Sequence, residues 1–225
     1  MKITGHRGAA GLELENTMPG FKLAKELGVD AIELDVQLTK DQQFVVCHDN
    51  HLRRVSTSTA SIHDLTYDEL KQIKLHNDYT VPLLTDILTV IENIPVIIDI
   101  KIHRNLPQLM EVLDRFPAIK FTLVGRPNSI IRECKRLRPN IPAFAGKCYT
   151  PFRIMRAIES HQADGLNLKV IWLNPLLYRA LQKRGYQVQV YNVDTVWIAQ
   201  LIQKMYPGIW ICTNRPDKLI HALRK

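Results

Sequence analysis

Titratable side chains gather near the ends of four extended segments in the first half of the chain. They are His6 and Arg7, Glu33 and Asp35, His48 and Asp49, and Asp99 and Lys101. Because side chains alternate between the two faces of a strand, Glu33 and Asp35 share one face, as do Asp99 and Lys101. The apolar neighbours of Glu33 and Asp35 take the opposite face. We therefore expect the acids to point together, away from the apolar packing.

Glu33, Asp35 and Asp99 are candidate ligands for a divalent metal ion. Burying several carboxylates together is costly unless a cation compensates their charge. A hard ion such as Ca²⁺ or Mg²⁺ takes oxygen ligands and leaves coordination positions for water or phosphate. One such acid alone is better explained by a salt bridge with a neighbouring Lys or Arg, but the three together favour the metal.

His6 and His48 are candidates for a general acid and base. An isolated histidine more often has a structural role, but these two follow neighbouring strands beside the carboxylates, where near-neutral imidazoles can transfer protons. The other six lack that setting and are assigned to the surface or to loops: His51, His63, His76, His103, His161 and His221.

Arg7 has two possible roles. Along an extended strand it would face away from His6, but the following Gly8 permits a turn. A turned Arg7 could bind two phosphate oxygens at once. The alternative is a salt bridge to Glu13 or Glu15, and the sequence leaves both roles open.

The elements that must position these residues alternate between short β-branched strands and longer helical segments, which is typical of α/β proteins. We predict strands at 2–5, 31–39, 95–101, 120–125, 142–146, 165–170, 187–193 and 209–213, with 43–48 as the far part of the second unit. We predict helices at 17–27, 83–92, 106–116, 129–137, 151–161, 175–184, 196–205 and 216–223.

Eight strand–helix units favour a closed TIM (β/α)₈ barrel over an open doubly wound sheet. An open sheet usually carries a glycine-rich phosphate loop after its first strand, and the segment 5–11 does not match the G-x-G-x-x-G spacing. In a TIM barrel the chemistry takes place at the carboxyl ends of the strands. The candidate residues follow or end the predicted strands, so a barrel would bring them to one mouth.

The composition is that of an ordinary globular protein, with 46% hydrophobic and 23% charged residues among 225. Thirty basic against 22 acidic residues give a net charge of +8, which favours anionic partners such as nucleic acid, anionic lipid or a phosphate substrate. Nucleic acid is not expected, because the basic run at 132–138 has the helical spacing of a solvated face.

The four cysteines, Cys47, Cys134, Cys148 and Cys212, are dispersed and are expected to be free thiols. No leader segment or long apolar segment is evident, which predicts a cytoplasmic protein without a stable membrane anchor. The sequence leaves the oligomeric state open.

Three blocks resemble the glycerophosphodiester phosphodiesterase family, over nearly the whole chain. The first is GHRG at 5–8 with Glu15, Asn16 and Thr17, similar to the family's HRG…ENT opening. The second joins GVDAIELDV at 28–36 with VVCHD at 45–49, similar to G-x-D-x-I-E-x-D-V…V-x-H-D. The third pairs VYNVD at 190–194 with TNRPD at 213–217, a looser match to V-W-T-V-N and T-D-R-P-D.

The resemblance implies a TIM barrel that hydrolyses small-molecule glycerophosphodiesters, such as glycerophosphocholine or glycerophosphoethanolamine, to sn-glycerol 3-phosphate and an alcohol. A glycerol hydroxyl would attack phosphorus with one histidine as base, while the other protonates the leaving alcohol. A divalent ion, Ca²⁺ or Mg²⁺, is implied as cofactor. The implied site residues are His6 and His48 for proton transfer, Arg7 and Lys101 for phosphate, Glu33, Asp35 and Asp99 for the metal, and Glu15, Asn16 and Tyr191 in support.

Three positions depart from the family's pattern. Asp99 stands where glutamate is more common, which bears on metal affinity and identity. Tyr191 replaces a tryptophan and Asn214 an aspartate, and both bear on the alcohol side of the pocket. None of these changes removes a candidate acid or base.

Residues 49–80 interrupt the strand–helix alternation and are interpreted as an inserted capping segment within a single domain spanning 1–225. The segment contains a predicted short helix at 67–74, with Thr66 and Glu69 as a capping box. We expect it to cover part of the barrel mouth and to shape the alcohol pocket.

Two other functions remain as alternatives. The first is a non-catalytic barrel that binds a phosphorylated ligand. The second is a lipid phosphodiesterase of the lysophospholipase D or sphingomyelinase D type, which the lack of an evident signal peptide, disulfide pairing or apolar anchor disfavours.

Overall fold

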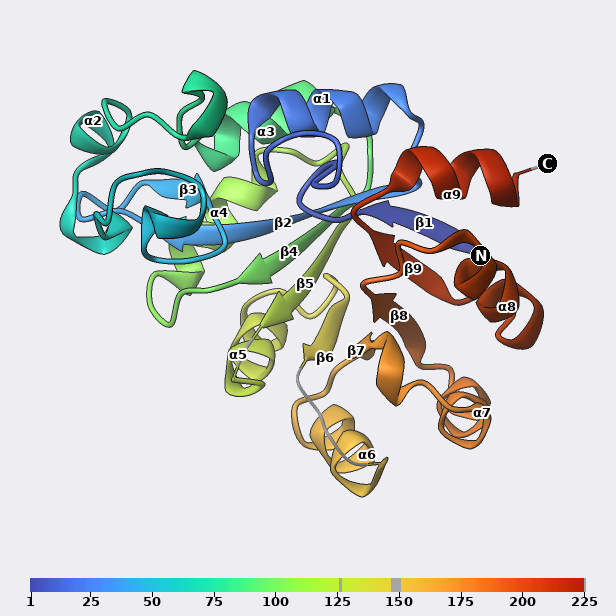
Figure 1. Cartoon of the computed structure of the whole chain (residues 1–225). Coiled ribbons are helices and arrows are strands. Elements are labelled where there is room, and N and C mark those ends of the chain that lie inside the picture. The colour runs from blue at the N-terminus through green and yellow to red at the C-terminus, as the bar shows by residue number, and fades with distance from the viewer. Residues whose placement is uncertain (126, 147–150, 225) are drawn as a thin grey trace.

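The chain folds into a closed barrel of parallel strands surrounded by helices (Figure 1). The computed structural model describes residues 1–125, 127–146 and 151–224. Within these residues, strands pair in the order β1-β9-β8-β7-β6-β5-β4-β2, and β1 also pairs with β2, which closes the ring. The TIM barrel predicted from the sequence is therefore confirmed.

The described elements follow the predicted alternation. The strands are β1 (Lys2–Gly5), β2 (Ala31–Leu38), β3 (Phe44–Val46), β4 (Val96–Ile100), β5 (Phe121–Gly125), β6 (Ala143–Gly146), β7 (Gly165–Lys169), β8 (Gln187–Tyr191) and β9 (Trp210–Thr213). The α-helices are α1 (Met18–Glu26), α2 (Tyr67–Leu70), α3 (Leu84–Ile91), α4 (Leu106–Asp114), α5 (Ser129–Leu137), α6 (Pro151–Ser160), α7 (Pro175–Lys183), α8 (Val196–Met205) and α9 (Pro216–Leu223).

Strand β3 lies outside the ring. It runs antiparallel to the end of β2, with Val46 opposite Val36. The chain reverses between the two strands because Gln42 takes a positive φ of 63° and Thr39 Oγ1 accepts a hydrogen bond from the Gln43 N–H at 2.9 Å. This hairpin returns the chain toward the carboxyl end of the barrel, where His48 follows β3.

Two apolar layers hold the barrel together. Ile32 and Leu34 of β2 face outward and are fully buried among the helices, as the alternation predicts. Inside the ring, Ala31 and Ile97 belong to a smaller apolar cluster with Phe144. Ala31 and Ile97 each precede an inward-facing acid by two residues, so this cluster lies one layer beneath the acids. Burial of each large side chain contributes about 1.5–3 kcal/mol to stability.

Residues 49–80 leave β3 and pack around a small core of their own. The core includes Leu52, Ile62 and Leu70, together with Val45 of β3. Helix α2 ends at Leu70 rather than at position 74 because the hydrogen bonds that follow span three residues, as in the Ile73 N–H to Leu70 carbonyl bond of 3.0 Å. The tighter turn stops the α-helix after about one turn.

The capping box predicted at the start of α2 is present in the structure. Thr66 Oγ1 accepts a hydrogen bond from the Glu69 N–H, and the Glu69 carboxylate accepts one from the Thr66 N–H at 2.8 Å. We expect Thr66→Ala to lower the free energy of unfolding by about 1 kcal/mol, because the Glu69 N–H loses its hydroxyl acceptor at the start of the helix. Urea denaturation measures the change, with the exposed Thr57→Ala as control. Equal effects of the two substitutions would contradict the prediction.

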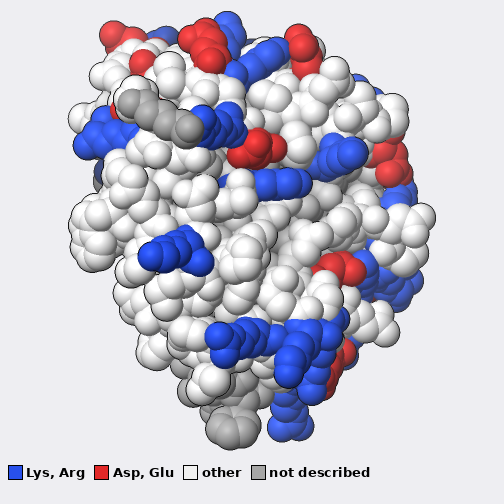
Figure 2. All heavy atoms as spheres, turned by 90° about the vertical axis from the view of Figure 1, so that its right-hand side faces the viewer, with Lys and Arg blue, Asp and Glu red and all other residues white. Residues whose placement is uncertain are grey.

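The basic residues on the surface do not form one continuous patch in the view of Figure 2. On this face Lys and Arg outnumber Asp and Glu but form several separate groups.

Three of the cysteines can be compared with the expectation of free thiols. Cys47, Cys134 and Cys212 are buried free thiols as expected, and Cys148 lies outside the described residues. Among the described helices, none combines the length and apolar character that a bilayer crossing requires.

Candidate active site

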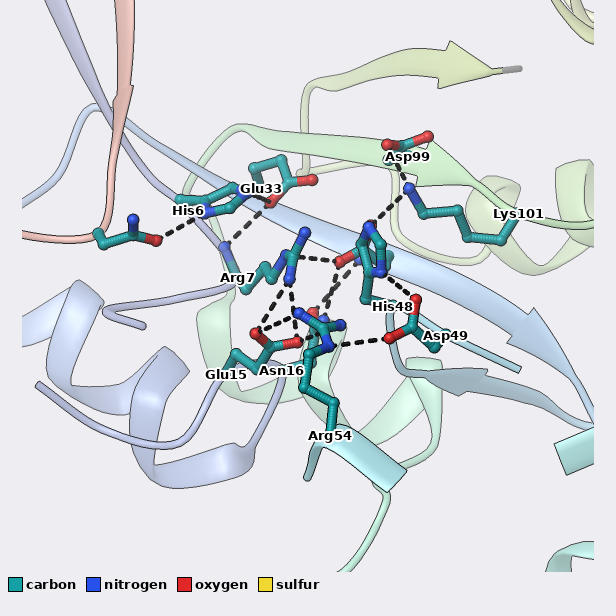
Figure 3. A network of polar contacts seen from close by, with 12 residues as sticks. His6, Arg7, Glu15, Asn16, Glu33, His48, Asp49, Arg54, Asp99 and Lys101 are labelled. Carbon is teal, nitrogen blue, oxygen red and sulfur yellow. Dashed lines mark hydrogen bonds and ion pairs between the residues drawn. The ribbon is translucent and has the colours of Figure 1, made fainter. Parts of the chain in front are cut away.

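The three predicted metal ligands come together on β2 and β4, and Figure 3 shows their surroundings. Asp35 and Asp99 are partners in the parallel register of these strands, and Glu33 lies two residues before Asp35 on the same face. One carboxylate oxygen from each acid lies within 4.8 Å of the others. All three side chains are buried, so a cation between them would be enclosed largely by carboxylate oxygen.

Two basic side chains partly neutralise the acids. Lys101 Nζ lies 2.5 Å from Asp99 Oδ2 and 2.9 Å from Asp35 Oδ1, and Arg7 Nε lies 3.1 Å from Asp35 Oδ2. Asn16 Nδ2 donates a further hydrogen bond to Asp35 Oδ2 at 2.9 Å. Burial opposes ionisation of Asp35, but the charges of Lys101 and Arg7 outweigh it and lower the pKa of Asp35 to about 2. Asp35 is therefore ionised near neutral pH.

Glu33 has the opposite electrostatic environment. Burial and the negative charges of Asp35 and Asp99 raise the pKa of Glu33 well above its ordinary range, and Arg7 and Lys101 do not offset them. A cation shared by the three acids would remove this repulsion, and carboxylate oxygens are the ligands that Ca²⁺ and Mg²⁺ prefer. The donor set therefore fits a hard divalent ion.

Arg7 reaches the acids because the chain turns directly after β1. Arg7 takes a positive φ of 49°, and Gly8 one of 86°. The turn directs the Arg7 N–H to Glu33 Oε2 at 3.0 Å and the Arg7 guanidinium to the Glu15 carboxylate at 2.9 Å. A Cβ on Gly8 would lie 2.7 Å from the Gly20 backbone, so glycine is required in this turn. Of its two predicted acidic partners, Arg7 contacts Glu15.

His6 is oriented by a chain of hydrogen bonds that starts at Asp194. Asn214 donates to both Asp194 oxygens, from its N–H at 2.7 Å and from Nδ2 at 2.8 Å. This orients the amide so that Asn214 Oδ1 faces His6 Nδ1 at 2.7 Å. Because an amide oxygen only accepts, we assign the proton to Nδ1 and the lone pair to Nε2, which lies 3.9 Å from Glu33 Oε2.

One further contact bears on this assignment. Asn192 Nδ2 also lies 2.9 Å from His6 Nδ1, and a donor there would favour the other tautomer. We give more weight to the Asn214 contact, because Asp194 fixes the orientation of the Asn214 amide. The Asn192 amide can instead present its oxygen to the same proton.

His48 has a carboxylate rather than an amide as its partner. His48 Nδ1 lies 2.6 Å from Asp49 Oδ1, and Arg54 Nε donates to the other Asp49 oxygen at 2.8 Å. Burial lowers the pKa of both His48 and His6; Arg7 adds to the effect at His6, whereas the charge of Asp35 opposes it at His48. Both imidazoles are therefore mainly neutral at pH 7 and able to accept a proton.

A single pocket of about 250 Å³ is shared by the predicted histidines and two of the predicted acids. The first half of the chain contributes His6, Arg7, Glu33, His48 and Asp99 to its lining. Strands β7 and β8 contribute Asn167, Lys169, Gln189 and Tyr191. The structure thus brings both candidate proton-transfer groups to one cavity beside the acid cluster.

Asn167, Lys169 and Gln189 are pocket residues that the sequence motifs did not indicate. A signal was nevertheless present. Asn167 and Lys169 alternate with leucines along β7, and Gln189 alternates with valines along β8. The same alternation that identifies Glu33 and Asp35 would therefore have placed these polar side chains inside the barrel.

Comparisons with known proteins agree with this geometry. Residues 6–218 match the Glycerophosphoryl diester phosphodiesterase family. The human protein named Lysophospholipase D GDPD1 is 31% identical, across 86% of this chain and 77% of the human one. The Glycerophosphodiester phosphodiesterase of Caldanaerobacter subterraneus subsp. tengcongensis is 26% identical, across 99% of this chain and 98% of that protein.

A solved structure shares the fold. It is an Oleispira antarctica phosphodiesterase in complex with the product sn-glycerol-3-phosphate, with a TM-score of 0.93 at 21% identity, across 100% of this chain and 97% of that one. The family match extends from His6 through the acids to the carboxyl-terminal helix. The chain is therefore a phosphoric diester hydrolase that belongs to the glycerophosphoryl diester phosphodiesterase family.

Proposed function

We propose that the protein hydrolyses glycerophosphodiesters, such as glycerophosphocholine or glycerophosphoethanolamine, to sn-glycerol 3-phosphate and an alcohol, using a divalent metal ion and two histidines. The observation that carries the proposal is that His6, His48, Glu33 and Asp99 line one pocket. Such a pocket can both move protons and bind the charge of a phosphodiester. The names of the related proteins support the same reaction.

Glu33, Asp35 and Asp99 would hold the metal ion, for which we propose Ca²⁺ or Mg²⁺. When bound, such an ion offsets negative charge on the phosphate oxygens and favours attack at phosphorus. The Asp99 carboxylate sits one methylene closer to its backbone than the glutamate more common at this position. We expect this shorter reach to alter the preferred ion.

Arg7 and Lys101 are proposed to bind the phosphate oxygens. Arg7 lies 3.1 Å from Asp35 and Lys101 lies 2.5 Å from Asp99, so both cations border the acid cluster. With the charge of the acids taken up by a metal ion, the N–H groups of both cations become available to the phosphate. Glu15 and Asn16 would support the site by orienting Arg7 and Asp35.

His6 is proposed as the base and His48 as the acid. The lone pair on His6 Nε2 would take the proton of the glycerol hydroxyl that attacks phosphorus. His48 is mainly neutral at pH 7, but the Asp49 carboxylate, 2.6 Å from His48 Nδ1, stabilises the imidazole once it is protonated, and this form can give its proton to the leaving alcohol oxygen. Water would then open the resulting cyclic phosphate, with the two imidazoles exchanging roles.

An assay of the purified chain on glycerophosphocholine tests the proposal. After treatment with a chelator, we expect choline and sn-glycerol 3-phosphate to be released only when Ca²⁺ or Mg²⁺ is added back. If no divalent ion supports turnover while the protein still binds sn-glycerol 3-phosphate, the non-catalytic phosphate-binding barrel is the better description.

The hydrogen-bond chain that orients His6 leads to a prediction about exchanging the residue types at positions 194 and 214. In the motifs quoted for the family, Asn and Asp occupy the places of Asp194 and Asn214. We expect Asp194→Asn and Asn214→Asp each to lower kcat by about 10-fold, because each single change breaks the chain that orients His6. In Asp194→Asn/Asn214→Asp, the new amide can donate to the new carboxylate, which can accept from His6 Nδ1. The double variant should therefore recover most of the activity.

Two measurements check this exchange. Steady-state kinetics of the three variants show whether the double variant is more active than either single one. Nitrogen NMR of the histidine rings shows whether the His6 proton stays on Nδ1. A double variant as impaired as the worse single variant would mean that the two side chains do not act through each other.

A second candidate function is hydrolysis of lysophospholipids, and exposed apolar residues at the mouth favour it. Ile171 and Trp172 follow β7, Leu176 begins α7 and Trp197 begins α8, so all four lie where these strands end; Ile171, Leu176 and Trp197 are exposed by 65–79%. Such a rim can contact acyl chains. The human relative carries the name of this activity.

Micellar lysophosphatidylcholine compared with soluble glycerophosphocholine distinguishes the two substrates. If lysolipid is the preferred substrate, Ile171→Ser and Trp197→Ser should raise KM for the micelles and leave glycerophosphocholine unaffected. Equal kinetics of both variants on both substrates would leave glycerophosphodiesters as the substrate class.

We also propose that residues 1–225 act as one domain in which residues 49–80 border the alcohol pocket. Arg54, from this segment, lies 2.8 Å from both Asp49 and Glu15. Tyr191 lines the pocket from β8 and would face the alcohol. Arg54→Ala is expected to change KM differently for choline and ethanolamine substrates, and an equal change for both would contradict a role in head-group selection.

A cytoplasmic location is proposed as well. Cys47, Cys134 and Cys212 are free thiols, which suits a reducing compartment. Fractionation of the source cells followed by immunoblotting tests this, and recovery outside the cytoplasmic fraction would contradict it.

A further inference from the structure

The pocket contains two buried amide side chains whose hydrogen-bonding groups are unused. Gln189 of β8 is fully buried, and neither its Oε1 nor its Nε2 has a hydrogen-bond partner among the described residues. Asn167 of β7 is 8% exposed, and its Oδ1 is likewise without a partner there. The two residues are partners in the β7–β8 register, and both line the pocket that also holds His6 and Glu33.

These amides are costly to keep without partners. A buried polar group that makes no hydrogen bond costs about 1–3 kcal/mol. The neighbouring interior layer is apolar: Gln189 is next to Trp210 in the β8–β9 register, and Trp210 packs against the cluster that contains Phe144 and Val124. An apolar side chain would therefore fit at position 189. An amide is favourable here only if a molecule in the pocket completes its hydrogen bonds.

The chemistry of the amides identifies that molecule's groups as hydroxyls. An amide offers uncharged donors and an acceptor, and a hydroxyl can accept from the first and donate to the second. A phosphate would bind the cations Arg7 and Lys101 instead, and a quaternary ammonium would favour aromatic faces. Because the amides adjoin the apolar layer that closes the barrel, they face the small, constant end of a substrate rather than its variable alcohol.

We infer that Gln189 and Asn167 bind the hydroxyl groups of the substrate's glycerol moiety and set the preference for glycerol-bearing phosphodiesters. This inference rests on the proposed function. The phosphate would lie at the acids and cations that follow or belong to β1, β2 and β4. The glycerol carbons would extend toward Asn167 and Gln189, of which Gln189 precedes Tyr191 at the end of β8. Hydrogen bonds from these two amides would then hold the glycerol hydroxyls in one orientation.

A pair of ligands isolates this interaction. sn-Glycerol 3-phosphate and propyl phosphate share the phosphate and the three-carbon chain and differ in two hydroxyl groups. With isothermal titration calorimetry in Mg²⁺, we expect the wild-type protein to bind the glycerol compound at least about 10-fold more tightly. Gln189→Met should lose most of this preference while its affinity for propyl phosphate changes little, and Asn167→Leu should act in the same direction.

Gln187→Met is the matched control. Gln187 lies on the same strand but is exposed, and it lines a different pocket together with Lys2 and Pro95. This variant should keep the full preference for sn-glycerol 3-phosphate over propyl phosphate. Thermal unfolding adds a second readout. Gln189→Met removes an unpaired amide from beside an apolar layer, so its melting temperature should not fall. If the amide had a purely structural role, its loss would lower the melting temperature.

Two results would overturn the inference: a wild-type protein that does not distinguish the two ligands, or a folded Gln189→Met that distinguishes them as well as wild type does. Asn167→Leu carries the same test if Gln189→Met does not fold. Turnover of glycerophosphocholine by the wild-type protein is measured separately. Failure of the proposed function is therefore visible independently of the ligand preference.

Discussion

Replacing His6 or His48 by alanine is expected to lower kcat/KM for glycerophosphocholine by about 10²- to 10⁴-fold. His6→Ala removes the lone pair proposed to accept the hydroxyl proton, and His48→Ala removes the proton proposed for the leaving alcohol. The two roles differ in their dependence on the leaving group. Choline needs a proton as it leaves, whereas p-nitrophenolate does not. A glycerophosphodiester of p-nitrophenol should therefore restore much of the activity of His48→Ala but not that of His6→Ala.

His221→Ala is the control, because this histidine is exposed on α9, away from the pocket. Rescue of His6→Ala instead of His48→Ala by the better leaving group would reverse the two assignments. Full activity of either alanine variant on glycerophosphocholine would remove that histidine from the mechanism. Because the two groups act in one proton-transfer sequence, we expect the double variant to be little worse than the more impaired single variant.

Glu33→Gln is expected to abolish metal-dependent activity, by about 10³-fold or more, because it removes one carboxylate from the metal ligands and one charge that attracts the ion. Without metal, the same variant should be at least as stable as the wild type. Burial and the charges of Asp35 and Asp99 raise the pKa of Glu33, and a neutral amide of the same shape removes that repulsion. Loss of metal response without loss of stability distinguishes a ligand from a structural residue.

Thermal unfolding with and without Ca²⁺ or Mg²⁺ measures this effect. An ion present at about 100 times its Kd stabilises the folded chain by about 2.7 kcal/mol, which the wild type should show and Glu33→Gln should not. Asp99→Glu provides a milder comparison, since it lengthens a ligand and should change which ion gives the greater stabilisation. A Glu33→Gln protein that still responds to either ion as the wild type does would argue against the three-acid site.

Much of the acid cluster could be predicted from the sequence because strand geometry is simple. Glu33 and Asp35 are two residues apart on a strand, and Asp99 lies on the strand next to theirs in the ring. The barrel could also be predicted, since eight strand–helix units close a ring whose chemistry lies at one end. The positions of His6, His48 and Arg7 at strand ends indicated their roles in the same way, and the family resemblance added a phosphate role for Lys101.

The hydrogen-bond partners within the site could not be predicted in the same way. His6 and Asn214 are 208 positions apart and meet only because β1 lies beside β9. Arg7 contacts Glu15 because of a backbone turn that the sequence permits without requiring. Gln189 belongs to no motif, and its significance depends on burial without a partner, which only the folded structure reveals.

The pairing of β1 with β9 has a consequence for how the protein is made. β1 leaves the ribosome long before Trp210–Thr213, which form one of its two partner strands. Until then, one edge of the nascent sheet remains open to other chains, and contacts of such long range form slowly. A growing chain can already bring the acids of β2 and β4 together, but it has no Asn214 to orient His6. The enzyme should therefore stay inactive on the ribosome until Asn214 has been synthesised and β9 has paired with β1.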